Sequence, residues 1–392
     1  MRRLLIAALP LSMAGVANAK TDLTVNGSAS VRASQNPYLD NTGNSQSTVS
    51  LVGVLSPTLT ISDAESQLNI GGSVQHIEYN RLYPSSDSVS ANASGNWRFS
   101  PKWTATASLG YDDSIVGENG FFDFGRFNDD GTRPPPTADD LTLAGRRIKR
   151  RSFSTQAGLN YQPNVRETVN FSLFANETRT LATIDTENYA TYGNTFGYSR
   201  QVSRRTSIGF TNTALRYECR SQTRCFTNSL QPQLTFSTTL GRDWTLSGSA
   251  GASFSQVRLP SQTADNVRPA GSATLCRRQT RMDICLTASQ TIETTVGSGA
   301  RPTLALTSSI NYRLDQKSSL GFTAGYTRSA GSALNQDDYD YLSARIFGSR
   351  SIARNVSFTV DGGYDRSANP FFGTRSNFSV SMGLSFSLGR TL

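Results

Sequence analysis

The sequence has few of the residues from which catalytic and metal-binding sites are usually built. Its 392 residues include one histidine, His76, and only four cysteines. After residue 19 there is no apolar run near the length of about 18 residues that a membrane-spanning helix needs. Almost all of the basic charge is arginine, without the lysine-rich runs and compact module of a nucleic-acid-binding protein. We therefore expect no helical membrane protein, no nucleic-acid partner, no metal and no cofactor.

The first 19 residues have the pattern of an export signal. Arg2 and Arg3 precede an apolar run from Leu4 to Val16, and Ala17, Asn18 and Ala19 follow as small residues at an A-x-A site. Such a segment is a signal peptide, cleaved before Lys20. We therefore divide the chain into residues 1–19, a signal peptide, and residues 20–392, a single domain.

The stretch from Phe378 to Leu388 shows the pattern that the rest of the chain repeats. Apolar residues alternate without a break with serine or glycine, which is the period of a β-strand with one apolar and one polar face. Eleven residues at about 3.3 Å each, tilted by roughly 45°, are long enough to cross a bilayer. Because lipid cannot satisfy an open sheet edge, we expect a closed barrel whose last strand pairs with its first.

Similar segments recur along the chain and predict an all-β, transmembrane, antiparallel up-and-down barrel. We count about eighteen strands, or sixteen if the segments on either side of Cys276 are misread. Alternate connections are short, near residues 63, 101, 163, 204, 242, 315 and 353, and those between them are mostly longer, as in outer-membrane barrels. In one strand the outward row begins with Trp103 and ends with Tyr111, which we assign to the two membrane surfaces.

The expected lumen carries polar residues and arginine. Its row includes Arg32, Arg98 and Arg313, and fixed positive charge in a hydrated pore favours anions. Arginines at strand ends would alternatively meet acidic sugars or phosphates at the membrane surface. In the longest loop, residues 113–147, acidic residues come before basic ones. If this loop folds into the lumen, these side chains form a charged constriction. If it stays outside, they are solvated and have no such role. The constriction candidates in this loop and just after it are Asp123, Arg126, Asp129, Asp130, Arg146, Arg147 and Arg150.

Four phenylalanines in the same loop would pack it against the wall or stack on the apolar face of a sugar. They are Phe121, Phe122, Phe124 and Phe127.

The four cysteines form two close pairs, Cys219 with Cys225 and Cys276 with Cys285, which in an exported protein predict two hairpin disulfides.

The only histidine is a poor candidate for catalysis. We place His76 and Glu78 on the lumen side of their strand, and Ile77 and Tyr79 on the lipid side. A hydrolase would need a nucleophile, a base and an orienting group that converge, and no such set is recognisable. We therefore expect that the protein is not an enzyme.

Two features of the sequence carry a family resemblance. Strands end in an aromatic residue beside a short turn, as from Arg98 to Trp103 and from Tyr312 to Leu320, and the chain finishes with the strand motif Gly-Leu-Ser-Phe-Ser-Leu. The chain resembles the β-barrel porins that accompany exopolysaccharide (sphingan-like) gene clusters in Gram-negative bacteria. The resemblance implies an outer-membrane location and a part in polysaccharide export. The terminal Leu392 departs from the usual final aromatic residue, and the cysteine pairs also depart from the pattern.

The sequence thus predicts an outer-membrane channel that passes anionic or saccharide solutes or assists exopolysaccharide export. The expected partners are outer-membrane lipid and lipopolysaccharide, the barrel-insertion machinery, and an exopolysaccharide or its export proteins. The alternatives are a docking barrel that does not conduct, a barrel hydrolase dependent on His76, and a soluble exported all-β protein.

Overall fold

The computed structural model describes most of the chain after the predicted signal peptide. The described residues are 20–39, 47–115, 147–180, 188–220, 225–258, 263–295, 299–331, 337–369 and 373–391. The predicted signal peptide, Leu392 and most of the predicted long loop lie outside these ranges. No helix in the described ranges is long and apolar enough to cross a membrane.

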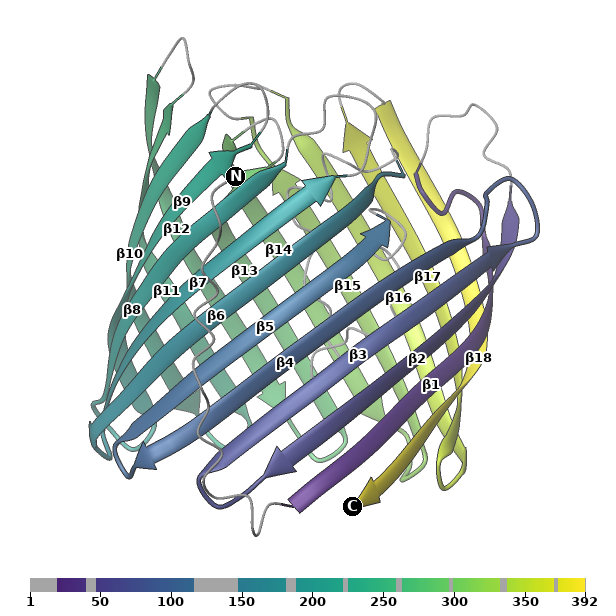
Figure 1. The fold of residues 1–392 in the computed structure, drawn as a ribbon, viewed down its shortest axis with the longest axis horizontal. Helices are drawn as coiled ribbons and strands as arrows, with labels where there is room; N and C mark the ends of the chain where they lie inside the picture. Colours follow the sequence, from purple (N-terminus) through teal and green to yellow (C-terminus); the bar gives the residue numbers. More distant parts are fainter. Residues whose placement is uncertain are drawn as a thin grey trace, which may run out of the picture.

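The described chain forms a closed antiparallel barrel of eighteen strands in sequence order (Figure 1). This confirms the predicted fold and the larger of the two predicted strand counts. The strands are β1 (Lys20–Ser34), β2 (Thr48–Ser62), β3 (Ser66–Tyr79), β4 (Ser86–Ser100), β5 (Trp103–Ile115), β6 (Lys149–Asn164), β7 (Glu167–Thr180), β8 (Tyr189–Gln201), β9 (Thr206–Cys219), β10 (Phe226–Leu240), β11 (Trp244–Arg258), β12 (Thr263–Arg278), β13 (Met282–Thr295), β14 (Gly299–Arg313), β15 (Ser318–Ser329), β16 (Tyr339–Ala353), β17 (Val356–Asn369) and β18 (Gly373–Thr391).

The ring closes between its first and last strands. β1 and β18 pair antiparallel from Asp22 opposite Thr391 to Ser34 opposite Ser379, without a register shift. Every strand therefore has two neighbours, and neither edge is left to seek a partner in lipid. The prediction that the end of the chain pairs with its beginning is confirmed.

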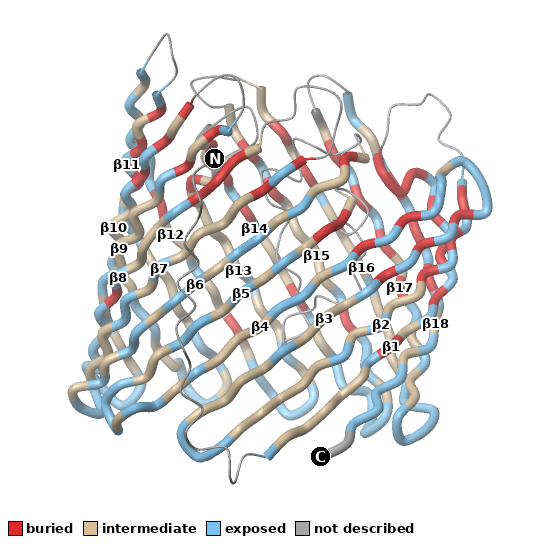
Figure 2. The backbone as a smooth tube through the Cα atoms, viewed as in Figure 1, coloured by how far each residue is buried: buried red, intermediate tan, exposed pale blue. Residues whose placement is uncertain are grey.

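The alternation read from the sequence sorts side chains to the two faces of the wall. On β18, Phe378, Val380 and Met382 are exposed on the outside, whereas Ser379 and Ser381, which alternate with them, are buried on the inside. Buried residues are concentrated in the half of the barrel nearer the long loops (Figure 2). The outside of the barrel is thus an apolar surface that a bilayer would cover, and the inside is polar.

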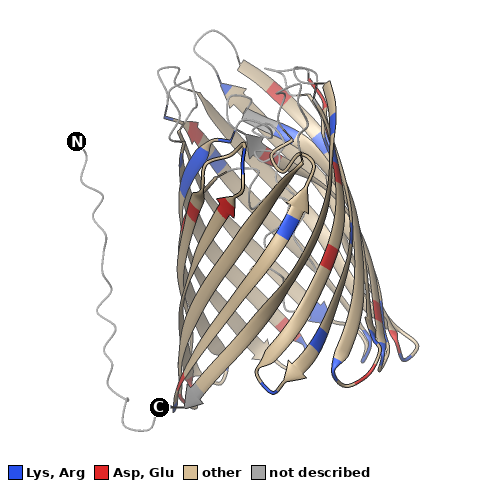
Figure 3. Ribbon diagram, turned by 90° about the vertical axis from the view of Figure 1, so that its right-hand side faces the viewer, with Lys and Arg blue, Asp and Glu red and all other residues tan. Residues whose placement is uncertain are grey.

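Aromatic side chains mark both borders of the apolar surface. Trp103 and Tyr111, at the two ends of one outward row on β5, are both exposed, and Leu109 between them is 52% exposed. At the short-turn end, Trp103 stacks on Tyr161 of the next strand, with ring centroids 4.4 Å apart. Charged residues gather mainly toward the two ends of the barrel (Figure 3). This arrangement is typical of a barrel that spans a membrane.

Short turns connect the strands at one end, and longer loops connect them at the other (Figure 1). In the turn between β2 and β3, the backbone N–H groups of Glu65 and Ser66 donate to Asp63 Oδ1 at 2.8 and 2.6 Å. These bonds hold the pKa of the Asp63 carboxyl below its usual value. The side chain closes the turn by satisfying backbone donors that a strand would otherwise bond.

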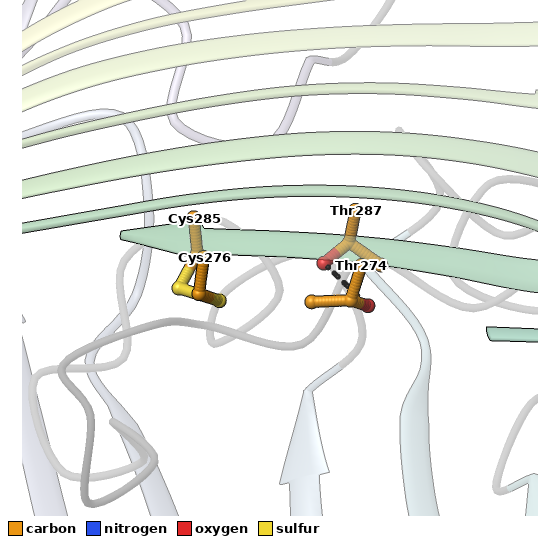
Figure 4. Close-up of a disulfide and its surroundings, with 4 residues drawn as sticks. All are labelled: Thr274, Cys276, Cys285 and Thr287. Carbon is orange, nitrogen blue, oxygen red and sulfur yellow. Dashed lines mark hydrogen bonds between the residues drawn. A yellow bond between two sulfur atoms is a disulfide. The ribbon is translucent and has the colours of Figure 1, made fainter. Parts of the chain in front are cut away.

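The cysteine pairs lie at opposite ends of the barrel. Cys219 and Cys225, with Cα atoms 5.1 Å apart, bracket the long-loop connection between β9 and β10. Cys276 and Cys285 face each other across β12 and β13, with Cα atoms 4.1 Å apart, near the short turn that joins these strands (Figure 4). Both pairs are at disulfide distance. The second pair joins neighbouring strands within the wall, next to the hydrogen-bonded Thr274 and Thr287.

Candidate functional site: the lumen and its outer mouth

The inner face is lined over much of its area by small side chains that carry hydroxyl groups. Because inward residues on neighbouring strands face each other in the antiparallel register, their hydroxyls pair across the strands. Such pairs, with oxygen atoms 3.1 to 3.2 Å apart, are Ser56–Ser73, Thr195–Thr213, Ser249–Ser272 and Thr274–Thr287. The result is a wall that offers hydrogen bonds without adding charge.

A recess of about 540 Å³ lies on this wall along β1 to β6. Its inward lining includes Asn26, Asn92 and Asp112, and otherwise consists mostly of serine, threonine and glycine. Hydroxyl and amide groups of this kind suit hydrated solutes, including saccharides. The recess therefore supplies polar contacts in the part of the lumen where few side chains are bulky.

A short segment after β1 folds into the outer mouth. Tyr38 and Leu39 are 1% and 2% exposed, and Tyr38 packs against inward side chains of β2 and β3. The hydroxyls of Tyr38 and Tyr79 lie 3.0 Å apart. The ring of Tyr83 lies 4.8 Å from that of Tyr38, and the guanidinium of Arg147 lies 5.1 Å from the same ring. We call Tyr38, Tyr79 and Tyr83 the mouth tyrosines.

Polar residues of β18 hold the backbone of this segment. Asn377 accepts hydrogen bonds at its side-chain oxygen from the Ser34 hydroxyl at 2.7 Å and from the Asn36 backbone N–H at 2.9 Å. Arg375 donates to the carbonyl of Leu39 at 2.6 Å. The segment is therefore attached to the wall on both sides, and it narrows the mouth on the side where β1 meets β18.

The same wall carries an ion pair within the lumen. Arg345 of β16 lies 3.2 Å from Asp361 of β17, and these side chains are 10% and 4% exposed. Farther along the same two strands, the Tyr341 hydroxyl donates to Asp365. The sequence reasoning missed these residues. The alternation places each of them on the inner row, but only the strand register brings the opposite charges together.

A further buried cation lies on the inner row at the long-loop end. Arg301 of β14 is 0% exposed and donates to the Ser329 hydroxyl at 3.2 Å and to the backbone carbonyl of Asp337. Its guanidinium lies 4.6 Å from the ring of Tyr339. Arg301 thus attaches the connection before β16 to the wall, as Arg375 does for the segment after β1.

The predicted lumen arginines lie on the inner row but do not form one cluster. Arg32 is 4% exposed near the outer mouth, whereas Arg98 and Arg313 lie at the short-turn ends of β4 and β14. Arg147 contacts the mouth tyrosines, and Arg150 lies at the start of β6. The other constriction candidates, Asp123, Arg126, Asp129, Asp130 and Arg146, and the loop phenylalanines, Phe121, Phe122, Phe124 and Phe127, lie outside the described residues.

The assignment of faces on the outer part of β3 was wrong. Ile77 and Tyr79 are buried inside, whereas the His76 side chain is 54% exposed on the outside, with Nδ1 2.8 Å from Asp87 and Nε2 3.5 Å from Glu78. The alternation alone assigns these apolar residues to the lipid side, but they pack against Tyr38 of the inward segment. His76 is therefore outside the lumen, among carboxylates.

Comparison with solved structures finds outer-membrane β-barrels. The FrpB iron transporter from Neisseria meningitidis (F3-3 variant) aligns with 90% of this chain and 63% of its own, at a TM-score of 0.52 and 11% identity. The unliganded ferric citrate transporter FecA aligns with 93% of this chain and 78% of its own, at 0.50 and 10%. The outer membrane protein OpdK from Pseudomonas aeruginosa aligns over 95% and 99%, at 0.48 and 11%.

At these identities the likeness shows the fold alone. The chain spans less than two thirds of the length of the FrpB structure. No family model matches the sequence, and no curated protein matches it at a significant level. FrpB and FecA are transporters, and what they share with this chain is the β-barrel fold.

Proposed function

We propose that the protein is an outer-membrane channel for small hydrophilic solutes, with a preference for anions and saccharides. The observation that carries the proposal is the polar inner face of a closed eighteen-strand barrel with an apolar exterior. A barrel of this size has room for an aqueous lumen. Hydroxyl and amide groups line the recess along β1 to β6, and they would replace part of the hydration shell of a passing solute.

The charge of the described inner row supports the preference for anions. Arg32, Arg301 and Arg345 are buried on that row, and Arg98 and Arg313 lie at its short-turn mouth. Asp361 offsets Arg345, and Asp112 and Asp365 lie on the same inner row, so they reduce the excess of positive charge that the other arginines give. Export of an acidic exopolysaccharide is the finer form of the proposal, supported by the resemblance noted in the sequence and by the same cationic row.

A docking barrel that does not conduct is the second candidate, and the inward segment favours it. Tyr38 and Leu39 occupy the outer mouth and are attached to β18. Such a barrel would insert in the membrane, keep its polar interior, and hold a partner at its rim. It would differ from a channel only in whether ions pass.

Single-channel recording of residues 20–392 refolded into planar bilayers separates the two candidates. A channel gives stepwise conductance, and a tenfold salt gradient gives a reversal potential of the sign that marks anion selectivity. Block of the current by an acidic oligosaccharide, with no block by a neutral one of the same length, would support the saccharide proposal. A folded, inserted barrel without current contradicts the channel and favours docking.

A further inference from the structure

The outer surface of the barrel has a hollow on one side that the proposed channel does not use. It measures about 800 Å³ and spans the outward faces of β8 to β12. Its lining is mainly apolar, with Leu230, Phe254 and Val267 at 43%, 46% and 65% exposure. Small Ala214 forms part of its floor. A concave apolar surface on the membrane-facing wall suits an acyl chain.

One amide group that lines the hollow has no hydrogen-bond partner among the residues that the structure describes. Asn194 lines the hollow from β8, and its side chain has no hydrogen bond to any residue that the structure describes. An amide that faces hydrocarbon without a partner is unfavourable by about 1–3 kcal/mol. A ligand that carries hydroxyl or amide groups beside its acyl chains would satisfy it.

Guanidinium groups surround the long-loop side of the hollow. Arg216 lines it, and the Arg216 and Arg258 guanidinium groups lie 5.1 and 5.4 Å from the ring of Phe226. Arg220 donates to the hydroxyl of Tyr192, another lining residue, at 2.9 Å. Arg216 also pairs with Glu218 and Arg220 with Glu177, each at 2.7 Å, and Asp265 lines the hollow. Aromatic and acidic side chains thus hold these arginines at the end of the hollow where headgroups would lie.

Among the described residues, the outer rim is more basic here than along β3 and β4. Along β5 to β12 it carries Lys149, Arg151, Arg179, Arg216, Arg220 and Arg258 against Asp113, Glu177, Glu218 and Asp265. Along β3 and β4 it carries His76 between Glu78 and Asp87. Arginine binds phosphate through paired N–H donors, so the basic side of the rim is complementary to a phosphorylated headgroup.

We propose that this hollow binds the phosphorylated, acylated saccharolipid of the outer leaflet, lipopolysaccharide, through its lipid A portion. Acyl chains lie on Leu230, Phe254 and Val267, a hydroxyl or amide of the lipid pairs with Asn194, and phosphate contacts Arg216 and its neighbours. Cys219 and Cys225 frame the connection that carries Arg220 and leads into Phe226, so this cysteine pair fixes the rim of the site. The proposal rests on the outer-membrane placement but not on conduction.

Titration of lipid A into the refolded protein in detergent, followed by native mass spectrometry, tests the site. We expect Arg216→Glu with Arg258→Glu to weaken binding at least tenfold. Arg366→Glu, on the outward row of β17, is the matched control and should leave binding unchanged. Ala214→Trp, which fills the hollow without changing charge, should also weaken binding at least tenfold. Dephosphorylated lipid A should bind the wild type as weakly as intact lipid A binds the double variant.

Equal binding of lipid A by the wild type and by both hollow variants, each shown to be folded by its heat-modifiable mobility, would overturn the proposal. The proposal would also be overturned if the wild type were an oligomer in lipid-free detergent and Ala214→Trp made it a monomer. The hollow would then be an interface between copies of the chain. Lipid A binding and single-channel conductance are measured independently. A failure of the lipid A site is therefore distinguishable from a failure of the proposed channel.

Discussion

Tyr38 and Tyr79, 41 positions apart in the sequence, meet inside the barrel with their hydroxyl oxygens 3.0 Å apart. Tyr79 is at the end of a wall strand, whereas Tyr38 belongs to a connection that leaves the wall and turns inward. This contact holds the inward segment against the wall at the outer mouth. It also explains why an apolar row on β3 faces inward.

The first prediction concerns this contact. Tyr38→Ala removes a fully buried ring and should lower the free energy of unfolding by about 3 kcal/mol, while Tyr38→Phe should cost only about 1 kcal/mol. If the protein conducts, Tyr38→Ala should also raise the single-channel conductance, because the inward segment loses its main contact. Urea titration of folding and bilayer recording measure the two effects. A conductance unchanged in Tyr38→Ala would mean that the segment does not limit the current.

The ion pair between Arg345 and Asp361 gives the second prediction. Asp361→Ala leaves a cation with little exposure near the lumen wall, and we expect a loss of about 2 kcal/mol, below the 3–5 kcal/mol of a dry pair because the lumen is hydrated. The double variant Arg345→Met with Asp361→Ala should recover most of that loss. Asp361→Ala should also shift the reversal potential toward stronger anion selectivity. Additive losses in the double variant would show that the two residues are not coupled.

Much of the wall could be predicted because one rule governs it. A period of two, combined with the need to close the sheet in lipid, was enough to count eighteen strands, to pair β1 with β18 and to place Trp103 and Tyr111 on the outside. The least regular segments, β12 and β13, are also strands, because each is hydrogen-bonded to a neighbour on both sides, β11 and β13 for β12, and β12 and β14 for β13.

The site was less predictable because it depends on contacts between distant positions. The sequence places Arg345 and Asp361 on inward rows, but their pairing follows from the register of β16 and β17. The rule that apolar residues face lipid failed at Ile77 and Tyr79, where an inward connection supplies another apolar environment. No periodicity marks Tyr38 as inward, so that environment could not be anticipated.

The third prediction tests the cysteine pairs. Mass mapping without reductant should find Cys219 joined to Cys225 and Cys276 joined to Cys285, and no free thiol at these positions. A disulfide that closes such a short loop contributes about 2 kcal/mol to the free energy of unfolding. Replacement of Cys276 and Cys285 by serine should therefore lower the urea concentration at which the whole barrel is half unfolded, because that pair joins two wall strands. Free thiols at Cys219 and Cys276 would contradict the assignment.

The fourth prediction concerns acidity at the long-loop end. Asp338, just before β16, accepts hydrogen bonds from Arg328 at 2.6 Å and from the Gly331 backbone N–H at 2.8 Å, and these interactions hold the pKa of its carboxyl below the usual value. Because this pKa is lowered by folding, the carboxylate stabilises the fold at pH values above its pKa in the unfolded chain. This contribution disappears as the pH falls through the lowered pKa of the folded state.

Because the Asp338 side chain is 39% exposed, the effect should be about 0.5 kcal/mol and local. Protection of the Gly331 amide, corrected for its intrinsic exchange rate, should fall as the pH drops below about 4. Asp338→Asn should reduce that protection at neutral pH and remove its dependence on pH. Protection that falls equally in the wild type and in Asp338→Asn would assign the effect to another group.

The fifth prediction compares two neighbours on β5 that face opposite ways. Leu109 points into the bilayer with 52% of its surface exposed, and Ser108 points into the lumen. Leu109→Arg should destabilise the barrel by about 2 kcal/mol, since it places a charge in hydrocarbon between the middle of the wall and the border at Tyr111. Ser108→Arg carries the same charge one position away and should leave stability nearly unchanged, while raising anion selectivity if the lumen conducts. Urea titration in lipid vesicles and salt-gradient recording provide the two measurements. Because the two variants differ only in the face that receives the arginine, equal destabilisation would contradict the assignment of lipid and lumen sides on which the proposed channel depends.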